Sequence, residues 1–128
     1  MSAFTKLLPS ITYGWAITIL IISVIPAEDL PSLNIWEPDK VMHAAVYALL
    51  TFLAWRMRQQ RRGNLRRLIN VIYSAVMCIA YGFCMEVIQQ ILPTRKFDLY
   101  DALANAIGCI LMVVLVVVFS GRDLQIQS

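Results

Sequence analysis

Polar and ionisable side chains recur at helical spacing inside three otherwise apolar stretches of this chain. Residues three or four apart on a helix lie on the same face, so each set can present its groups together. Carboxylate and imidazole groups can exchange protons, while amide and phenol groups orient a ligand through hydrogen bonds. The three sets are Asp39, His43 and Tyr47; Glu86 with Gln89 or Gln90; and Asp98, Asp101, Asn105 and Gly108.

Glu86 and His43 are the candidate catalytic residues. Ionisable residues within a membrane-spanning helix are costly and usually face a bundle interior or a water-filled cavity. Glu86 lies seven residues before Pro93, which places it on the order of 10 Å inside the end of its helix. A carboxylate at that depth suits general acid or base chemistry, with His43 as its partner. The alternative for both residues is a structural role in an interhelical hydrogen bond.

The remaining polar residues are candidates for binding a headgroup. Arg95 and Lys96 lie on the side of the membrane that basic residues normally avoid, which indicates an anionic partner there. That partner is either an acidic residue of the protein or a phosphate, pyrophosphate or carboxylate on a lipid. Asp39 and Asp101 also fit an ordinary role at helix starts. The candidate binding residues are Asp39, Lys40, Tyr47, Gln90, Arg95, Asp98, Asp101 and Asn105.

The sequence contains no recognisable metal or cofactor motif, so neither is assigned. Metal binding by His43, Glu86 and Asp101 is possible, but their spacing matches no metal-binding motif, and whether a metal is bound is left open. No haem, nucleotide or flavin motif appears. The three cysteines are odd in number, fall inside apolar segments and lack zinc-ligand or CxxC spacing, so we expect them to be packing residues.

Long apolar segments must position these groups. Of the 128 residues, 59% are hydrophobic and 15% are charged, whereas a soluble domain has roughly 25% charged residues. A membrane-spanning helix needs roughly 20 apolar residues, so this length accommodates four spans in one domain over residues 1–128. We therefore predict an all-α bundle of four transmembrane helices. The expected spans run from about Leu7 to Ile25, from Pro38 to Trp55, from Leu68 to Leu92 and from Ala102 to Phe119.

Charge along the chain predicts its orientation. Six arginines lie together between the second and third spans, and by the positive-inside rule this connection faces the cytoplasm. The acidic loop at residues 26–40 then faces the opposite side, and both termini are cytoplasmic. Because topology accounts for the basic cluster, nucleic-acid binding is not expected. These patterns predict a multi-pass protein of the bacterial cytoplasmic (inner) membrane, in contact with the lipid bilayer.

The ordered combination of these motifs resembles the VanZ-like family of small membrane proteins. The matching residues are DKVMH from position 39 followed by Tyr47, then EVIQQ from position 86, Arg95, Asp98, Asp101, Asn105 and Gly108. The family takes its name from a protein linked to resistance to the glycopeptide teicoplanin. The resemblance implies a cell-envelope protein acting near cell-wall precursors or envelope lipids, and it supplies no catalytic scheme.

Several functions fit this sequence. The first is binding of an anionic lipid or lipid-linked cell-wall precursor at a polar pocket in the outer leaflet, and the second is an enzyme that modifies such a lipid. A small proton-coupled drug transporter is a third, although Glu86 lies within a larger polar cluster rather than alone in an apolar bundle. A structural membrane adaptor is a fourth. Whether a reaction is catalysed, and the oligomeric state, are left open by the sequence.

Overall fold

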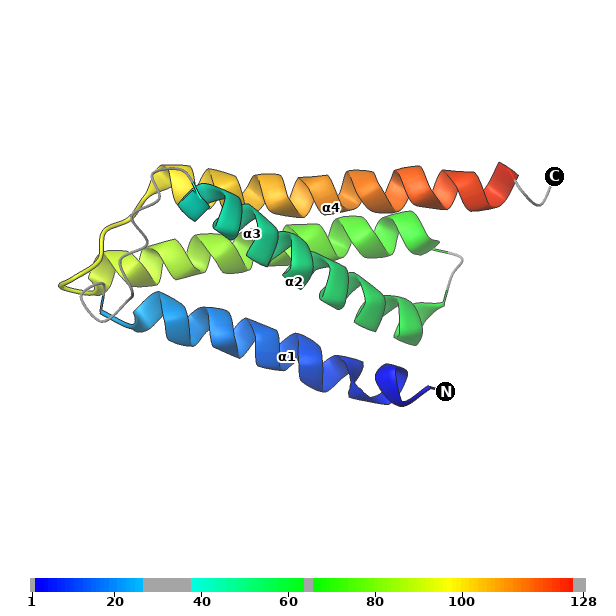
Figure 1. Ribbon diagram of the computed structural model, residues 1–128, viewed down its shortest axis with the longest axis horizontal. Helices are drawn as coiled ribbons and strands as arrows, with labels where there is room; N and C mark the ends of the chain where they lie inside the picture. Colours follow the sequence, from blue (N-terminus) through cyan, green and yellow to red (C-terminus); the bar gives the residue numbers. More distant parts are fainter. Residues whose placement is uncertain (1, 27–37, 64–65, 126–128) are drawn as a thin grey trace.

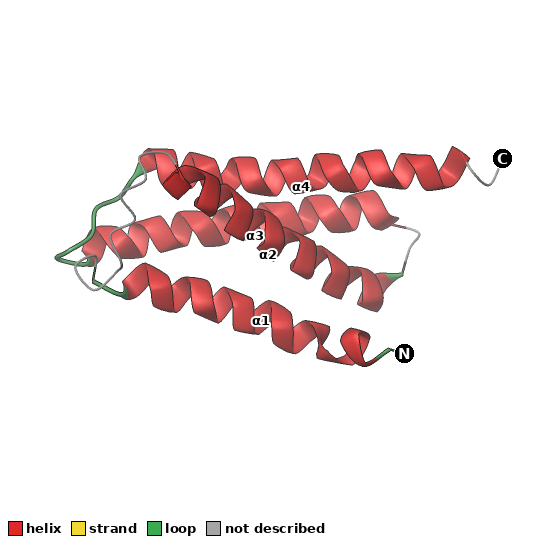
Figure 2. Ribbon diagram, viewed as in Figure 1, coloured by secondary structure: helices red, strands yellow, loops and turns green. Residues whose placement is uncertain are grey.

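Four α-helices in sequence make up the fold, and no strand occurs in the described part of the chain (Figures 1 and 2). The computed structural model describes residues 2–26, 38–63 and 66–125, with side chains from Lys40 onward in the second range and up to Ser120 in the third. The all-α prediction is confirmed. The helices are α1 (Ala3–Val24), α2 (Pro38–Arg62), α3 (Arg67–Ile91) and α4 (Leu99–Gln125).

The helix ends follow local sequence signals. The hydroxyl of Ser2 accepts a hydrogen bond from the Thr5 N–H and caps α1, as small hydroxyl residues do at N-termini. α2 begins at Pro38 as predicted but continues beyond Trp55 through the arginines, until Gly63 stops it with a positive φ of 76°. Glycine adopts this left-handed conformation without steric cost, which is why it commonly terminates helices.

Three of the four helices are long and apolar enough to cross a membrane, namely α1, α3 and residues 99–120 of α4. α2 falls short of this composition because Lys40 and His43 lie near its start and arginines fill its last turns. The chain is therefore a membrane protein. A membrane crossing by α2 is a prediction, and it agrees with the length of this helix and with its position among the other three.

Successive helices run in opposite directions, so the start of α1, the α2–α3 connection and the end of α4 lie at one end of the bundle (Figure 1). This arrangement agrees with the prediction that both termini share the side of the arginine cluster. α2, α3 and α4 all pack against one another, while α1 packs against α2 and α3. The acidic loop predicted to face the other side falls largely on residues 27–37, outside the described residues.

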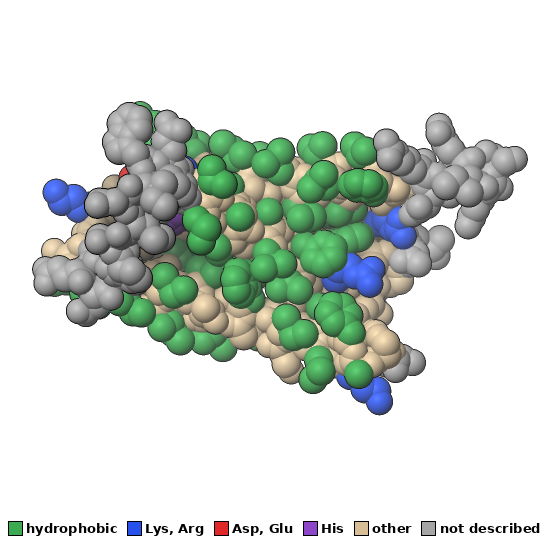
Figure 3. All heavy atoms as spheres, viewed as in Figure 1, with side chains coloured by type: hydrophobic (Ala, Val, Ile, Leu, Met, Phe, Trp, Pro, Cys, Tyr) green, Lys and Arg blue, Asp and Glu red, His purple; other side chains and the backbone are tan. Residues whose placement is uncertain are grey.

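Hydrophobic side chains cover the outside of the bundle, and basic side chains gather at the end where α2 meets α3 (Figure 3). Such an apolar exterior suits lipid. The interior combines aliphatic, aromatic and sulfur-containing residues. Cys78 and Cys109 are buried, as expected for packing residues, whereas Cys84 is exposed. The main core consists of Ile19, Tyr47, Leu50, Ala75, Cys78, Met85 and Cys109.

Two glycines allow the helices that carry the polar residues to approach closely. A Cβ at Gly108 on α4 would meet the carbonyl oxygen of Ala44 on α2 and lie 2.9 Å from the Ala44 Cα. A Cβ at Gly82 on α3 would lie 2.9 Å from the ring of Tyr47. Small residues at helix interfaces permit such close packing. The glycines thus bring the polar faces of α2, α3 and α4 within reach of one another.

Candidate functional site

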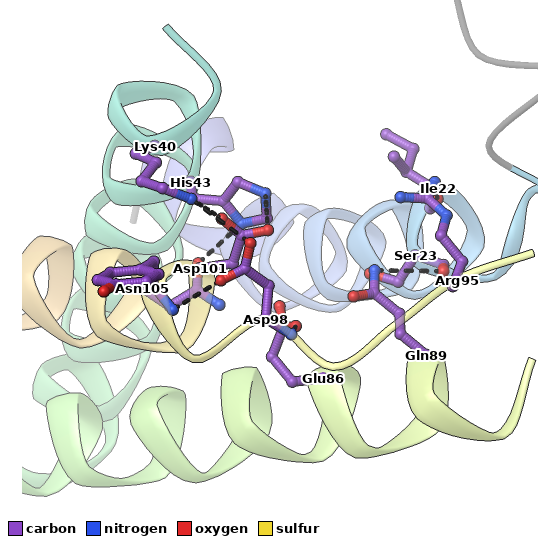
Figure 4. Close-up of polar contacts among 11 residues, drawn as sticks. Ile22, Ser23, Lys40, His43, Glu86, Gln89, Arg95, Asp98, Asp101 and Asn105 are labelled. Carbon is purple, nitrogen blue, oxygen red and sulfur yellow. Dashed lines mark hydrogen bonds and ion pairs between the residues drawn. The ribbon is translucent and has the colours of Figure 1, made fainter. Parts of the chain in front are cut away.

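Polar side chains from α2, α3 and α4 converge at the end of the bundle opposite the arginines (Figure 4). The ammonium group of Lys40, on the first turn of α2, lies 2.7 Å from Oδ1 of Asp101 on the first turn of α4. It also lies 3.7 Å from Oδ2 of Asp98, just before α4. These ion pairs fix the start of α2 against the start of α4.

His43 lies one turn further into α2, between two residues of α4. Its Nδ1 is 3.1 Å from Oδ1 of Asn105, and its Nε2 is 3.6 Å from Oδ2 of Asp101. An amide oxygen can only accept a hydrogen bond, so the Nδ1 carries the proton in this contact. The bond to Asn105 therefore directs the Nε2 of His43 toward the carboxylate of Asp101.

Glu86 on α3 completes the cluster from the opposite side, with only 2% of its surface exposed. Its Oε2 accepts a hydrogen bond of 3.3 Å from the backbone N–H of Asp98. One ligand atom from each of His43, Glu86 and Asp101 lies within 4.8 Å of the others. The predicted catalytic pair is therefore brought together, with Asp101 as a third member that the sequence had assigned to binding.

A cavity of about 230 Å³ adjoins this cluster. Its wall divides into two kinds of surface, because one part is aliphatic and the other carries imidazole, carboxylate, amide and hydroxyl groups. The aliphatic part consists of Ile19, Ile22, Met42, Val46 and Met85. The polar part consists of Ser23, His43, Tyr47, Glu86, Gln89 and Asn105.

Arg95 does not enter this site. Its guanidinium group donates to the carbonyl oxygen of Ile25 at 3.1 Å and of Ile22 at 3.5 Å (Figure 4). These carbonyls belong to the C-terminal end of α1, where backbone acceptors lack intrahelical partners and a cation is favoured. Among the described residues, Arg95 thus contacts the end of α1.

We expect Arg95→Ala to loosen α1 while leaving the α2–α4 contacts intact. The change removes the hydrogen bonds to Ile22 and Ile25, a loss of about 1–2 kcal/mol. Hydrogen exchange monitored by mass spectrometry should show faster exchange at the C-terminal amides of α1. Lys96→Ala is the matched control, because Lys96 is exposed; equal exchange in the two variants would contradict this role of Arg95.

The other predicted residues differ in their relation to the cavity. Tyr47 is 3% exposed and lines it. Gln90 is exposed outside it, and Gln89 lines it instead, donating to the carbonyl oxygen of Ser23 at 3.4 Å. The side chain of Asp39 lies outside the described residues. The contribution of α1 was missed, since Ser23 and its aliphatic neighbours carry no distinguishing sequence signal.

The fold and the site identify the protein as an all-α membrane protein whose helices enclose a polar cluster and an amphipathic cavity at one end of the bundle. The sequence profile of the VanZ/LLP1 family matches residues 5–120, and the chain belongs to this family. An uncharacterised protein of the yeast Schizosaccharomyces pombe is 32% identical over 96 residues, covering 74% of this chain and 56% of that protein. The chain thus spans about half the length of this curated relative. No solved structure matches it.

Proposed function

We propose that the protein binds the polar headgroup of an envelope lipid in the cavity beside His43 and Glu86, with the start of the lipid chain against the aliphatic wall. The observation that supports this most is the division of the cavity wall into an aliphatic part and a polar part. Binding pockets typically combine an apolar lining with a few polar groups that fix orientation. A lipid has the same division between headgroup and chain.

The polar groups of the cavity wall favour a headgroup rich in hydroxyl or amide groups. They also suit an anionic headgroup whose negative charge is neutralised by a cation. Within the cavity wall, Gln89, Asn105 and Tyr47 provide donors and acceptors, whereas Glu86 would repel an unshielded phosphate. Because a relative occurs in a yeast, we favour a lipid class that bacterial and fungal membranes share over a precursor confined to bacterial walls.

We also propose that the protein lies in the bacterial cytoplasmic membrane, with the site in the outer leaflet. Membership of the VanZ/LLP1 family supports a further proposal, that occupancy of the site changes the response of the cell to teicoplanin. A protein that binds envelope lipids or lipid-linked wall precursors would act on the surface that glycopeptides reach. This link rests on lipid binding at the cavity.

Native mass spectrometry of protein released from bacterial membranes tests the binding proposal. We expect wild type to retain a lipid and Gln89→Ala to lose most of it, because Gln89 lines the cavity. Gln90→Ala removes the same amide one residue further on, from an exposed position outside the cavity. It is the matched control and should retain the lipid. Equal retention by both variants would mean that the lipid binds outside this cavity, and no lipid in wild type would favour a structural adaptor instead.

A catalytic role at the same site is the second candidate function. It is favoured by the approach of the His43, Glu86 and Asp101 ligand atoms to within 4.8 Å and by the bond that orients His43. Such an arrangement resembles an acid–base pair with its orienting group. Native mass spectra also distinguish the two functions. An enzyme would convert a supplied lipid into a product of different mass, whereas the Glu86→Gln variant would leave the mass of the lipid unchanged.

A further inference from the structure

The cluster of His43, Glu86 and Asp101 combines imidazole nitrogen with carboxylate oxygen from three different helices. The Nε2 of His43 and the Oδ2 of Asp101 are 3.6 Å apart, close to the roughly 3.4 Å that separates two ligands bound about 2.0–2.2 Å from a tetrahedral metal. Ligand atoms of the three residues lie within 4.8 Å of one another. To bind a common metal, the longest of these separations would have to shorten by up to about 1.4 Å.

The hydrogen bond between His43 and Asn105 is a second and independent feature of a metal site. Metal-binding histidines almost always donate their other ring N–H to an oxygen, which fixes the tautomer and the ring orientation. His43 makes this contact through Nδ1, and Asn105 is itself 2% exposed. The coordinating nitrogen is then Nε2, which is the atom that faces Asp101.

The buried negative charge of Glu86 also supports a bound cation. Glu86 is 2% exposed, and its described hydrogen bond is to one backbone N–H. A buried carboxylate needs a nearby positive charge or must be neutralised. A divalent cation between Glu86 and Asp101 would supply the compensation at the buried carboxylate.

We propose that His43, Glu86 and Asp101 bind one divalent cation of the zinc or manganese class. One imidazole with two carboxylates suits Zn²⁺, and its carboxylate oxygens also suit Mn²⁺, whereas calcium prefers six to eight oxygen ligands. The cation leaves Oδ1 of Asp101 to Lys40 and uses Oδ2, which faces His43. Sequence spacing gave no sign of the site because each ligand comes from a separate helix.

Such a cation would also make the cavity suitable for an anionic headgroup, a role that rests on the proposed function. Without it, Glu86 opposes a phosphate; with it, an open coordination position beside the cavity would attract a phosphate oxygen. The cation site itself does not depend on lipid binding. Its experiment therefore measures the metal directly.

Manganese provides a spectroscopic test. Purified protein in detergent, stripped with chelator and returned to buffer, is titrated with Mn²⁺ while electron paramagnetic resonance records the free ion. We expect one Mn²⁺ per chain, displaced by Zn²⁺, and an electron spin-echo modulation from one histidine nitrogen in the wild-type complex. Because this signature needs no substitution, it holds even where a variant fails to fold. Absence of tight Mn²⁺ binding, or binding without nitrogen coupling, would overturn the proposal.

Mn²⁺ titration of substituted proteins tests which residues bind the ion. His43→Gln and Glu86→Gln should each weaken Mn²⁺ binding by roughly tenfold or more, whereas two controls should bind it as wild type does. Cys84→Ser removes the exposed thiol, and Asp123→Asn changes an acidic residue in the last turn of α4. Unchanged binding in His43→Gln would refute the assignment. Lipid retained by protein that binds no Mn²⁺ would refute the metal site alone, and Mn²⁺ bound by protein that retains no lipid would refute the lipid site alone.

Discussion

The Gly108→Ala substitution is expected to destabilise the folded bundle by about 2–3 kcal/mol, because it adds an atom where two backbones are already in contact. A Cβ at this position would meet the carbonyl oxygen of Ala44 and lie 2.9 Å from its Cα. A side chain could rotate away from such a contact, but a helix backbone can relieve it only by moving as a whole. α2 and α4 must therefore separate, and the contacts of Lys40 and His43 with α4 should lengthen.

Thermal unfolding in detergent, followed by circular dichroism, measures this loss. Gly14→Ala is the matched control, since a Cβ at Gly14 would meet nothing within 4 Å. That change should be neutral or slightly stabilising, because alanine favours a helix more than glycine does. Equal melting temperatures for the two variants would show that α2 and α4 do not approach each other as closely as this structure has them.

Asn105→Leu is expected to weaken Mn²⁺ binding by about 10–100-fold without removing any of the three ligands. Leucine has a similar size but cannot accept the hydrogen bond of 3.1 Å from His43. The imidazole would then lose the partner that holds its Nε2 toward Asp101, and a half-buried N–H would lose its acceptor. We expect the affinity to fall through orientation rather than through loss of charge.

Asn105→Asp separates orientation from simple disruption of the core. It retains an acceptor oxygen for His43, so binding should stay much closer to wild type than in Asn105→Leu, as measured by the same Mn²⁺ titration. The nitrogen coupling should also persist. Similar losses in both variants would mean that Asn105 acts only through packing at the α3–α4 interface, where a Cβ at Gly82 would lie 3.3 Å from the Asn105 Cβ.

Much of this architecture could be predicted from the sequence because the bilayer imposes simple rules. Apolar length gave the four helices, and four-residue spacing put His43 and Tyr47 on one face of α2, where both line the cavity. Because successive helices cross the membrane in opposite directions, the acidic, amide and imidazole side chains were predicted to meet at one end of the bundle. The VanZ-like resemblance rested on the same residues, and the family match confirms it.

Other features depend on groups that a sequence does not distinguish. The partners of Arg95 are backbone carbonyls of α1, which every residue carries. Both Gln89 and Gln90 fit the helical spacing after Glu86, and only the packing of α1 shows that Gln89 faces the cavity. α2 continues through the arginines to Arg62, well past its expected end at Trp55. Arginine is a good helix former, so a helix need not end where its apolar segment ends.

The gathering of six arginines at the end of the bundle remote from the site also has an electrical consequence. In an energised membrane each elementary charge carried across gains or loses about 2.3 kcal/mol per 100 mV. Turning the bundle over would move all six arginines against an inside-negative potential. In the proposed orientation, the membrane field would therefore oppose inversion of the bundle, and the proposed site would sample the lipids of one leaflet only. A ligand lipid made in the opposite leaflet would then have to be flipped across the bilayer before the site could bind it.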